Sequence, residues 1–305
     1  MEFFQYLSLV RFKALASLLK NYSNKNVSII LDLEDSAQDL FSKKKTKDLK
    51  NICREGLIYI SKKKILIKNN IFIRINKIET EEFASDIKAI KSSIQYGLRI
   101  KGIFVPKVEN FSELNKTNNI LNKNYRIKLV PIIETKKGLE NLENIVKKDK
   151  KKIISHVHYG HFDYCLDQNL WPFPEPYHKE YWDIIIPMLK ILKKYKYNFV
   201  QTPFPLIKNY SIYWSSVKYI KEVLKISKFN MSLVRHDKKF FTRPNKIKKL
   251  KIKPMSKNNS FKIIFAKKIY KEYLDNKSSK KSFSLSKKRF IAPHQFIMAK
   301  RFLKI

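Results

Sequence analysis

The chain has 305 residues, and its 44% hydrophobic content excludes a disordered protein and predicts a sizeable buried core. Its formal net charge is +39, from 65 lysine and arginine residues against 26 aspartate and glutamate residues. A nucleic acid or an anionic membrane would suit that charge. Only nine of the 65 are arginine, however, and the lysines run through nearly every predicted helix beside many isoleucines and asparagines, a bias typical of A/T-rich codons. Nucleic-acid binding is therefore not the favoured interpretation.

The two cysteines, Cys53 and Cys165, show neither metal-ligand spacing nor a disulfide framework, which favours buried thiols in a reducing cytoplasm. The N-terminal stretch MEFFQYLSLVRFK lacks the basic region and cleavage site of a signal peptide, so we interpret it as a first strand. No apolar run approaches the roughly 18 residues of a membrane span, and we expect a protein that does not enter a membrane.

Short β-branched runs alternate with longer, lysine-rich stretches of helical period as far as about residue 235. The expected strands are Tyr6–Val10, Val27–Leu33, Ile71–Ile75, Gly102–Val105, Ile127–Ile133, Ile153–Tyr159, Phe199–Thr202 and Met231–Val234. The expected helices are Phe12–Tyr22, Lys43–Lys62, Glu81–Tyr96, Phe111–Asn122, Lys137–Lys148, Tyr181–Tyr195 and Ile212–Ile226. Such repetition predicts a parallel (β/α)₈ TIM barrel, whose active site would form on the loops after the strands. An open doubly wound sheet is the alternative, although no GxGxxG motif supports a dinucleotide-binding version.

After His236 the pattern changes to lysine-rich segments and two amphipathic helices, expected over Phe261–Leu274 and Pro293–Leu303. We therefore divide the chain into a catalytic barrel, residues 1–236, and a C-terminal helical extension, residues 237–305. The extension is expected to serve as a lid or to contact a neighbouring subunit.

Charged side chains gather at the ends of five consecutive predicted strands. They are Asp32, Glu34 and Asp35, then Arg74, then Lys107, then Glu134, and then Asp163. Because strand ends meet at one barrel mouth, these carboxylates would repel one another unless neutralised. A divalent cation with oxygen ligands, Mg²⁺ or alternatively Mn²⁺, would neutralise them, and we assign its direct ligands to Glu134 and Asp163. For each carboxylate a solvated loop position or a helix N-cap is the alternative, for Asp35 in particular.

Five segments in order along the chain resemble a known family. They are ILDLEDS, FIRIN, GIFVPKVEN, VPIIETKKGLENLENI and YGHFDY. The chain resembles the HpcH/HpaI aldolase/citrate lyase family, in its citrate lyase β-subunit-like and malyl-CoA lyase-like branch. The resemblance covers about residues 5–235, with a weaker similarity in FAKKIYKEYL and IAPHQFIMAKRFL near the end.

The resemblance implies a barrel whose Mg²⁺ is held by the Glu of the IET motif and the Asp of the G-x-x-D motif, Glu134 and Asp163 here. It also implies that Arg74 of the RIN motif contacts a substrate carbonyl or carboxylate. Glu34 and Asp35 of the LDLED motif would order metal-bound water. Members of the family often assemble as trimers or hexamers, so a homo-oligomer is expected.

We assign Lys107 and Thr135, which follow the fourth and fifth strands, to substrate binding. A Schiff base on Lys107 is disfavoured, because nearby carboxylates favour the charged ammonium. In the segment HVHYGH, His161 is the expected general base beside Asp163. The alternatives are a transition-metal cluster with His156 and His158, or histidines satisfied by backbone carbonyls.

Three segments raise further questions. Relatives carry an IHP motif near the eighth strand, where this chain has NMSLVRHDKKF with His236. Some relatives carry Asp-Gly on a lid that reaches a neighbouring active site, where this chain has serine and lysine in FSLSKKRFIAPH. The aromatic loop Leu170–Trp182 is expected to form a lid, a substrate wall or a subunit interface, with a packed surface loop as the alternative.

The sequence thus predicts a Mg²⁺-dependent carbon–carbon lyase or aldolase. Its substrate would be a small carboxylate-bearing molecule, an acyl-CoA thioester or a 2-keto acid, and the reaction would pass through a metal-stabilised enolate. One alternative is a barrel with lost or altered catalysis that serves as a binding or assembly subunit, which the changed C-terminal motifs favour. A polyanion-binding protein is the other, motivated by charge alone.

Overall fold

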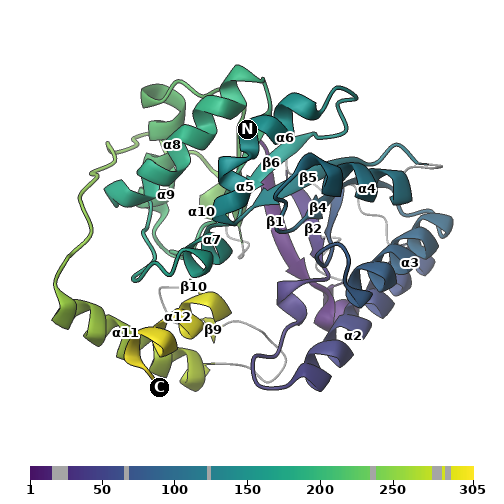
Figure 1. Ribbon diagram of the computed structural model, residues 1–305, viewed down its shortest axis with the longest axis horizontal. Coiled ribbons are helices and arrows are strands. Elements are labelled where there is room, and N and C mark those ends of the chain that lie inside the picture. Colours follow the sequence, from purple (N-terminus) through teal and green to yellow (C-terminus); the bar gives the residue numbers. More distant parts are fainter. Residues whose placement is uncertain (16–26, 65–68, 122–124, 234–237, 277–283, 286–289) are drawn as a thin grey trace.

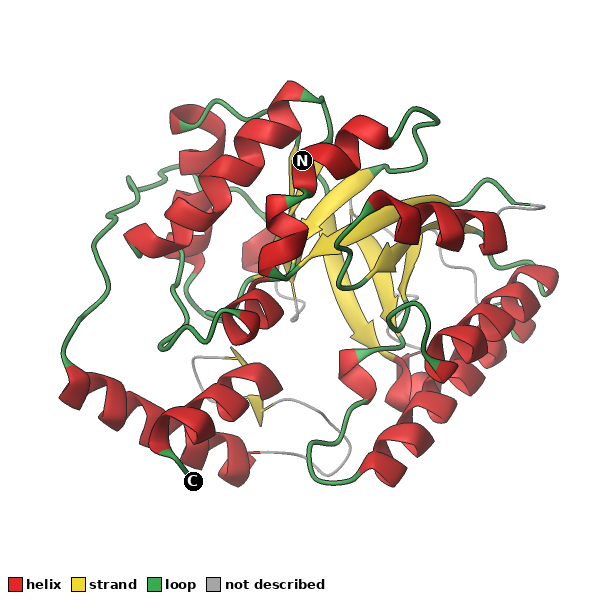
Figure 2. Ribbon diagram, in the orientation of Figure 1, coloured by secondary structure: helices red, strands yellow, loops and turns green. Residues whose placement is uncertain are grey.

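The computed structural model describes residues 1–15, 27–64, 69–121, 125–233, 238–276, 284–285 and 290–305. Eight parallel strands close into a barrel, in which each strand pairs with the next and the eighth returns to the first, with helices around it (Figures 1 and 2). The strands are β1 (Phe3–Ser8), β2 (Val27–Asp32), β3 (Ile71–Arg74), β4 (Ile100–Val105), β5 (Lys128–Ile133), β6 (His156–Tyr159), β7 (Asn198–Pro203) and β8 (Phe229–Leu233). The predicted (β/α)₈ TIM barrel is confirmed.

The first strand begins earlier than predicted. β1 covers Phe3–Ser8 rather than Tyr6–Val10, because Phe3 pairs with Val27 of β2 and closes the barrel against β8. The hydroxyl of Ser8 then caps a 3-10 turn, η1 (Leu9–Arg11), which ends the strand before Val10.

The sixth strand begins later than predicted, at His156 rather than Ile153. The carboxylate of Asp149 accepts the backbone N–H groups of Ile153 and Ile154 at 2.8 and 3.1 Å. These two donors are thereby withheld from the sheet, so the continuous strand begins at His156, although Ile154 already forms an isolated bridge with Leu129 of β5.

The helices around the barrel follow the predicted alternation. They are η2 (Asp35–Ala37), α2 (Lys43–Lys62), α3 (Glu81–Gln95), α4 (Phe111–Leu121), α5 (Lys136–Glu140), α6 (Leu142–Lys148), α7 (His161–Asp167), α8 (Lys179–Lys194), α9 (Tyr210–Lys218), the π-helical turn η3 (Tyr219–Val223) and α10 (Lys238–Phe241). The predicted helix Lys137–Lys148 is two helices that meet at Asn141. Most of the predicted helix Phe12–Tyr22 lies outside the described residues.

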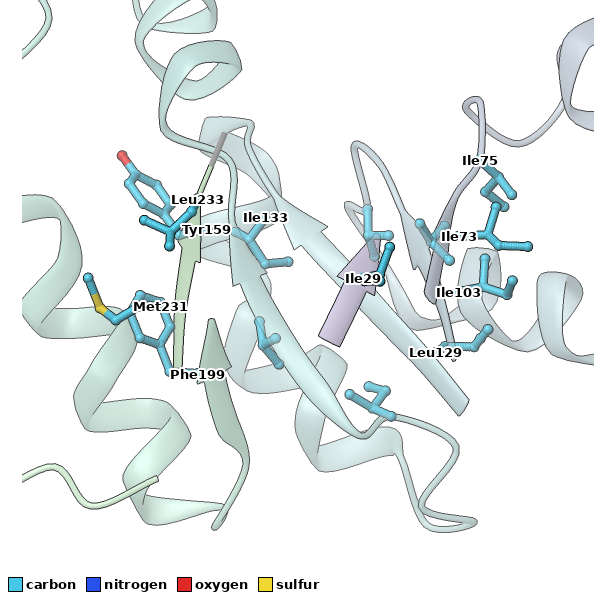
Figure 3. Packing of buried hydrophobic residues seen from close by; sticks show 14 of the residues in the cluster. Ile29, Ile73, Ile75, Ile103, Leu129, Ile133, Tyr159, Phe199, Met231 and Leu233 are labelled. Carbon is cyan, nitrogen blue, oxygen red and sulfur yellow. The ribbon is translucent and has the colours of Figure 1, made fainter. Parts of the chain in front are cut away.

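The barrel has two apolar layers. Side chains on the outer faces of the strands, among them Ile29, Ile73, Ile103 and Leu129, pack against the helices (Figure 3). Side chains on the inner faces form a second cluster of Phe4, Ile30, Phe72, Phe104, Val130, Ile132 and Val200. Both faces of each strand are buried, which explains why the strands are continuous apolar runs in the sequence.

The C-terminal segment packs on the barrel. Helices α11 (Asn259–Asn276) and α12 (Pro293–Leu303) lie side by side and share an apolar cluster with Cys165, Trp171 and Phe173 (Figure 1). A short antiparallel pair, β9 (Ser284–Leu285) with β10 (Phe290–Ile291), precedes α12, whose bounds match the prediction. No helix in the described ranges combines the length and apolar character needed to cross a bilayer.

Candidate active site

The inner face of the barrel changes from apolar to polar within one pleat. Side chains two residues apart on a strand share a face, so each inner residue of the apolar layer is followed by another inner residue nearer the mouth. Four such pairs are Phe4 and Tyr6, Ile30 and Asp32, Phe72 and Arg74, and Ile132 and Glu134. On β6, His156 packs edge-on against the ring of Phe4, and His158 follows it toward the mouth. The alternation of the strands therefore delivers acidic, basic and imidazole groups to one place.

Strand register sets Asp32 beside Arg74, since the two residues are paired across β2 and β3. The guanidinium binds Asp32 through two hydrogen bonds, with Nε to Oδ1 at 2.7 Å and Nη2 to Oδ2 at 2.6 Å. Its Nη1 also lies 3.0 Å from Glu34 Oε2 and 3.0 Å from Asp35 Oδ2. The ring of Tyr6 lies under the guanidinium, 5.0 Å from the centroid to Cζ. Arg74 is thus held by three carboxylates and one aromatic face.

Asp32, which the sequence groups with the strand-end carboxylates without a role of its own, is a site residue. Besides binding Arg74, its carboxylate accepts the backbone N–H groups of Glu34 and Ser36 at 3.0 and 3.1 Å, which shapes the turn after β2. Burial alone would raise the pKa of Asp32, but the charge and hydrogen bonds of Arg74 outweigh it and lower the pKa. Asp32 is therefore the carboxylate that fixes Arg74 and orients the two acids that follow it.

Lys107 connects the two predicted metal ligands. Its backbone N–H donates to Glu134 Oε1 at 2.8 Å, and its Nζ lies 3.1 Å from Asp163 Oδ1. Lys107 adopts φ of 52°, in the left-handed region that costs a residue with a side chain free energy. The strained turn after β4 thereby brings one residue into contact with both acids.

Gly160, between β6 and α7, lets Glu134 approach the backbone closely. A Cβ added at Gly160 would overlap Glu134 Oε2 and lie 2.5 Å from Glu134 Cβ. Only glycine leaves this space, so the Gly of the G-x-x-D segment is required by packing against the acid on the neighbouring strand.

Five carboxylates at the mouth face three cationic side chains. The acids are Asp32, Glu34, Asp35, Glu134 and Asp163, and the bases are Arg74, Lys107 and His294. Burial and the charge of Asp35 raise the pKa of Glu34 to about 8, even with Arg74 beside it. Burial and the charges of Asp163 and Glu34 raise the pKa of Glu134 well above its usual range. The cluster therefore has more carboxyl groups than its own bases can neutralise, and Glu34 and Glu134 hold protons more readily as a result.

His294, in the first turn of α12, reaches the mouth from the C-terminal segment. Its Nε2 lies 3.0 Å from Asp163 Oδ2, and the residue is 8% exposed. Burial would raise the pKa of Asp163, but His294 and Lys107 outweigh it and lower the pKa. Sequence reasoning missed His294. The only signals were the weak similarity of IAPHQFIMAKRFL and the presence of a histidine at a predicted helix start.

His161 lines the cavity, but both of its ring nitrogens are engaged. Its Nε2 lies 2.7 Å from the carbonyl of Pro174, and its Nδ1 lies 3.1 Å from the hydroxyl of Tyr159. Burial lowers the pKa of His161 to about 4. A role as general base would require one of these contacts to break, and it stays a prediction.

Thr135 and the aromatic loop lie away from the cavity lining. Thr135 Oγ1 accepts the N–H of Gly138 at 3.0 Å as the N-cap of α5, and Thr135 is not among the residues that line the cavity. Its contact with substrate stays a prediction. In the loop Leu170–Trp182, the side chains of Trp171 and Phe173 are buried against α11 and α12. The loop packs the C-terminal helices and is not among the residues that line the described cavity, which agrees with the alternative of a packed loop; a lid, substrate wall or subunit interface stays a prediction.

A cavity of about 500 Å³ opens at the mouth. Its polar side includes Asp32, Asp35, Arg74, Glu134 and Asp163. Its apolar side includes Leu7, Val10, Phe162, Pro203, Phe290 and Pro293. The space is large enough for a small substrate that has both a charged end and a carbon skeleton.

The donor set fits a divalent cation. Asp35, Asp163 and His294 each present one ligand atom within 4.8 Å of the others. The predicted ligand Glu134 is not in this group of described residues, and Lys107 contacts both Glu134 and Asp163. Burial and neighbouring carboxylates raise the pKa values of Glu34 and Glu134 despite Arg74 and Lys107, as expected where acids outnumber the nearby positive charges. Carboxylate oxygens are the ligands that Mg²⁺ and Mn²⁺ prefer.

Comparison with solved structures shows the same fold at low sequence identity. RipC from Yersinia pestis is 15% identical with a TM-score of 0.54, covering 80% of this chain and 96% of that chain. The citrate lyase β subunit from M. tuberculosis, complexed with oxaloacetate and magnesium, is 14% identical with a TM-score of 0.56, covering 76% and 90%. Haloferax volcanii malate synthase, in a pyruvate/acetyl-CoA ternary complex, is 12% identical with a TM-score of 0.66, covering 98% and 88%.

A search of curated proteins found no match. The HpcH/HpaI aldolase/citrate lyase family model matches residues 16–176, more than half of the chain and the stretch that holds every predicted site residue from Glu34 to Asp163. The chain belongs to the HpcH/HpaI aldolase/citrate lyase family.

Proposed function

We propose that this protein is a Mg²⁺- or Mn²⁺-dependent carbon–carbon lyase acting beside the carbonyl group of a small carboxylate-bearing substrate, a 2-keto acid or an acyl-CoA thioester. The observation that carries the proposal is the surplus of buried carboxylates at the mouth, where Glu34 and Glu134 keep raised pKa values beside Arg74 and Lys107. Membership of an aldolase and citrate lyase family supports a lyase-type enzyme.

Cleavage of a bond beside a carbonyl passes through an enolate, whose oxygen must be stabilised as it becomes negative. A divalent cation held by Glu134 and Asp163 would supply a Lewis acid at that oxygen. Arg74 lines the cavity and is fixed by Asp32, so it would bind a substrate carbonyl or carboxylate without reorganising. Glu34 and Asp35, which also contact Arg74, would orient water at the same place.

A proton must also be moved at the reacting carbon. Glu34 has a pKa of about 8, so it exchanges a proton near neutral pH, as a general acid or base requires. His161 remains the base predicted from the sequence. Lys107, whose Nζ lies beside Asp163, would contribute positive charge for substrate binding.

The proposal is tested by hydrogen exchange at the substrate carbon, which needs no knowledge of the second product. Pyruvate, acetyl-CoA and propionyl-CoA are incubated with the protein and Mg²⁺ or Mn²⁺ in D₂O, and loss of the proton signals beside the carbonyl is followed by NMR. Exchange with at least one of them is expected, together with a metal-induced rise in Tm. Both effects should vanish in Glu134→Gln and Asp163→Asn.

The matched control is Asp167→Asn on the same helix as Asp163. Asp167 accepts the backbone N–H of Lys136 at 2.9 Å, outside the cavity lining, so its loss should leave exchange and metal response intact. A protein that binds neither Mg²⁺ nor Mn²⁺ would refute the metal-dependent lyase. Metal binding without exchange would instead favour a binding or assembly subunit that has kept the family's barrel.

Two coarser expectations accompany this function as proposals. The C-terminal extension, residues 237–305, would act with the barrel, residues 1–236, rather than as a separate unit, because α12 reaches Asp163. Assembly into a trimer or hexamer would be checked by light scattering of the purified protein.

A further inference from the structure

Three buried histidines lie near the mouth, and only two of them have both ring nitrogens engaged. His158 contacts the hydroxyl of Tyr6 at 3.1 Å and the carbonyl of Val200 at 3.0 Å, and His161 is held in the same manner. His294 has Asp163 on Nε2, whereas its buried Nδ1 has no hydrogen-bond partner among the described residues. A buried nitrogen without a partner is unfavourable, so packing alone explains His294 poorly. The nitrogen that a cation would meet is Nε2, which faces Asp163.

The position of His294 fits a ligand. Its Nε2 is 3.0 Å from Asp163 Oδ2, and adjacent ligands of an octahedral ion with bonds of about 2.1 Å are separated by about 3.0 Å. Asp35 completes a group of three ligand atoms that all lie within 4.8 Å of one another. A single cation would therefore meet all three side chains after small side-chain rotations.

The support behind His294 is rigid. α12 packs against α7, which carries Asp163, and both helices share an apolar cluster that includes Cys165, Phe296 and Met298. Two ligands on helices that pack together are held at a fixed separation without metal. This preorganisation is what a ligand pair needs in order to bind an ion at low entropic cost.

An imidazole changes which ion a carboxylate site prefers. Mg²⁺ favours oxygen donors, whereas imidazole nitrogen suits first-row transition ions, whose affinity for nitrogen donors rises along the series after Mn²⁺. We propose that His294 is a direct ligand of the divalent cation, together with Asp35 and Asp163, and that α12 thereby makes the site select a transition-metal ion over Mg²⁺. This inference rests on the metal site of the proposed function: it adds His294 as a ligand, gives Asp35 direct ligation in place of orienting water, and adds an ion class.

The test measures metal binding rather than catalysis. Affinities for Mn²⁺ and Mg²⁺ are determined by titration calorimetry for the wild type, His294→Ala and His294→Gln. Loss of the imidazole is expected to weaken Mn²⁺ binding by about tenfold or more, and Mg²⁺ binding by less than about threefold. Pulsed EPR of bound Mn²⁺ should show coupling to a histidine nitrogen in the wild type and no such coupling in either variant.

Two controls separate ligation from packing. Arg301→Ala alters α12 at a residue that contacts Asn169, and His178→Ala removes a histidine that accepts the N–H of Glu175 outside the cavity. Both should retain the Mn²⁺ affinity and the nitrogen coupling. If His294→Ala does not fold, His294→Gln and the wild-type spectrum decide the question.

Mn²⁺ binding that is unchanged in both His294 variants, or a wild-type spectrum without nitrogen coupling, would overturn the role of His294. Either result would leave the lyase proposal standing, provided that Glu134→Gln and Asp163→Asn still abolish binding. Absence of any metal binding by the wild type would overturn both proposals together.

Discussion

The two walls of the cavity differ in chemistry. The wall built from β2 to α7 carries Asp32, Asp35, Arg74, Glu134 and Asp163, whereas the wall built from β1, β7 and the segment before α12 carries mainly apolar side chains and Thr202. The charged wall lies within residues 16–176, the stretch that matches the family. The apolar wall lies largely outside that stretch.

This difference separates two tasks. Charge at the mouth is provided by residues that the strand register fixes, as with Asp32 and Arg74. The opposite wall sets the shape of the space beside them. We therefore expect changes in the charged wall to affect folding and metal binding, and changes in the apolar wall to affect substrate selection alone, with His294 as the proposed exception.

The largest effect is expected for Arg74→Met. The side chain of Asp32 is 3% exposed, so removal of the guanidinium leaves a buried carboxylate without its counter-charge. The free energy of unfolding, measured with urea in metal-free buffer, should fall by about 3–5 kcal/mol. Arg11→Met, an exposed arginine at the same cavity, should change it by less than about 0.5 kcal/mol. Equal losses of unfolding free energy in the two variants would show that the buried ion pair of Arg74 and Asp32 does not stabilise the fold.

A glycine substitution tests the same wall through packing. Gly160→Ala would push a methyl group into Glu134. Gly102→Ala, on β4, would place a methyl group 2.9 Å from the ring of Phe72 on β3. Each should destabilise the protein by about 1–3 kcal/mol. Only Gly160→Ala should also weaken Mg²⁺ or Mn²⁺ binding in calorimetry, by about tenfold or more. A parallel loss of metal affinity in Gly102→Ala would point to general distortion of the barrel.

The pH dependence of metal binding tests the charge surplus itself. Glu34 ionises near 4.5 when unfolded and at a pKa of about 8 when folded, so the unfolded state holds fewer protons between these values. Metal-free stability should therefore fall as pH rises from about 4.5 to about 8. A cation must displace that proton, so its affinity should rise over the same window by up to about tenfold per pH unit. Thermal unfolding with and without Mg²⁺ at each pH measures the metal-free stability and the metal-induced stabilisation. Stabilisation by Mg²⁺ that does not depend on pH would contradict the raised pKa of Glu34.

The smallest effect is expected for Thr202→Val on the apolar wall. Thr202 lines the cavity at the end of β7, and its buried hydroxyl has no partner in the described part of the chain. Its removal should change stability by less than about 0.5 kcal/mol and leave metal affinity unaltered. A change confined to the KM for substrate would support the division between the walls, whereas a weakened metal site would break it.

The fold was predictable because the strands of this barrel are buried on both faces and the helices between them are amphipathic. α2 and α12 were placed at their observed bounds from helical period alone. Glu34, Asp35, Arg74, Lys107, Glu134 and Asp163 could be placed at one mouth, because each follows a strand and parallel strands end on the same side.

Residues that depend on tertiary contacts could not be predicted. The start of β1 is set by pairing of Phe3 with strands on both sides, which no local pattern reports. The engagement of His161 by Pro174 depends on a loop that packs under α11. His294 reaches the mouth only because α12 docks on α7, and the sequence separation between them carries no periodic signal.

The closure of the barrel by its two most distant strands also constrains the order of folding. β1 pairs with β8, and the backbone N–H of Glu2 donates to the side chain of Asn230, 228 positions away. Contacts of such high contact order form slowly, because a long loop must close before they contribute. His294 lies later still in the chain, so the complete mouth can assemble only after α12 has also been synthesised. A nascent chain that ends before α12 therefore carries the acidic residues of the mouth without the helix that covers them.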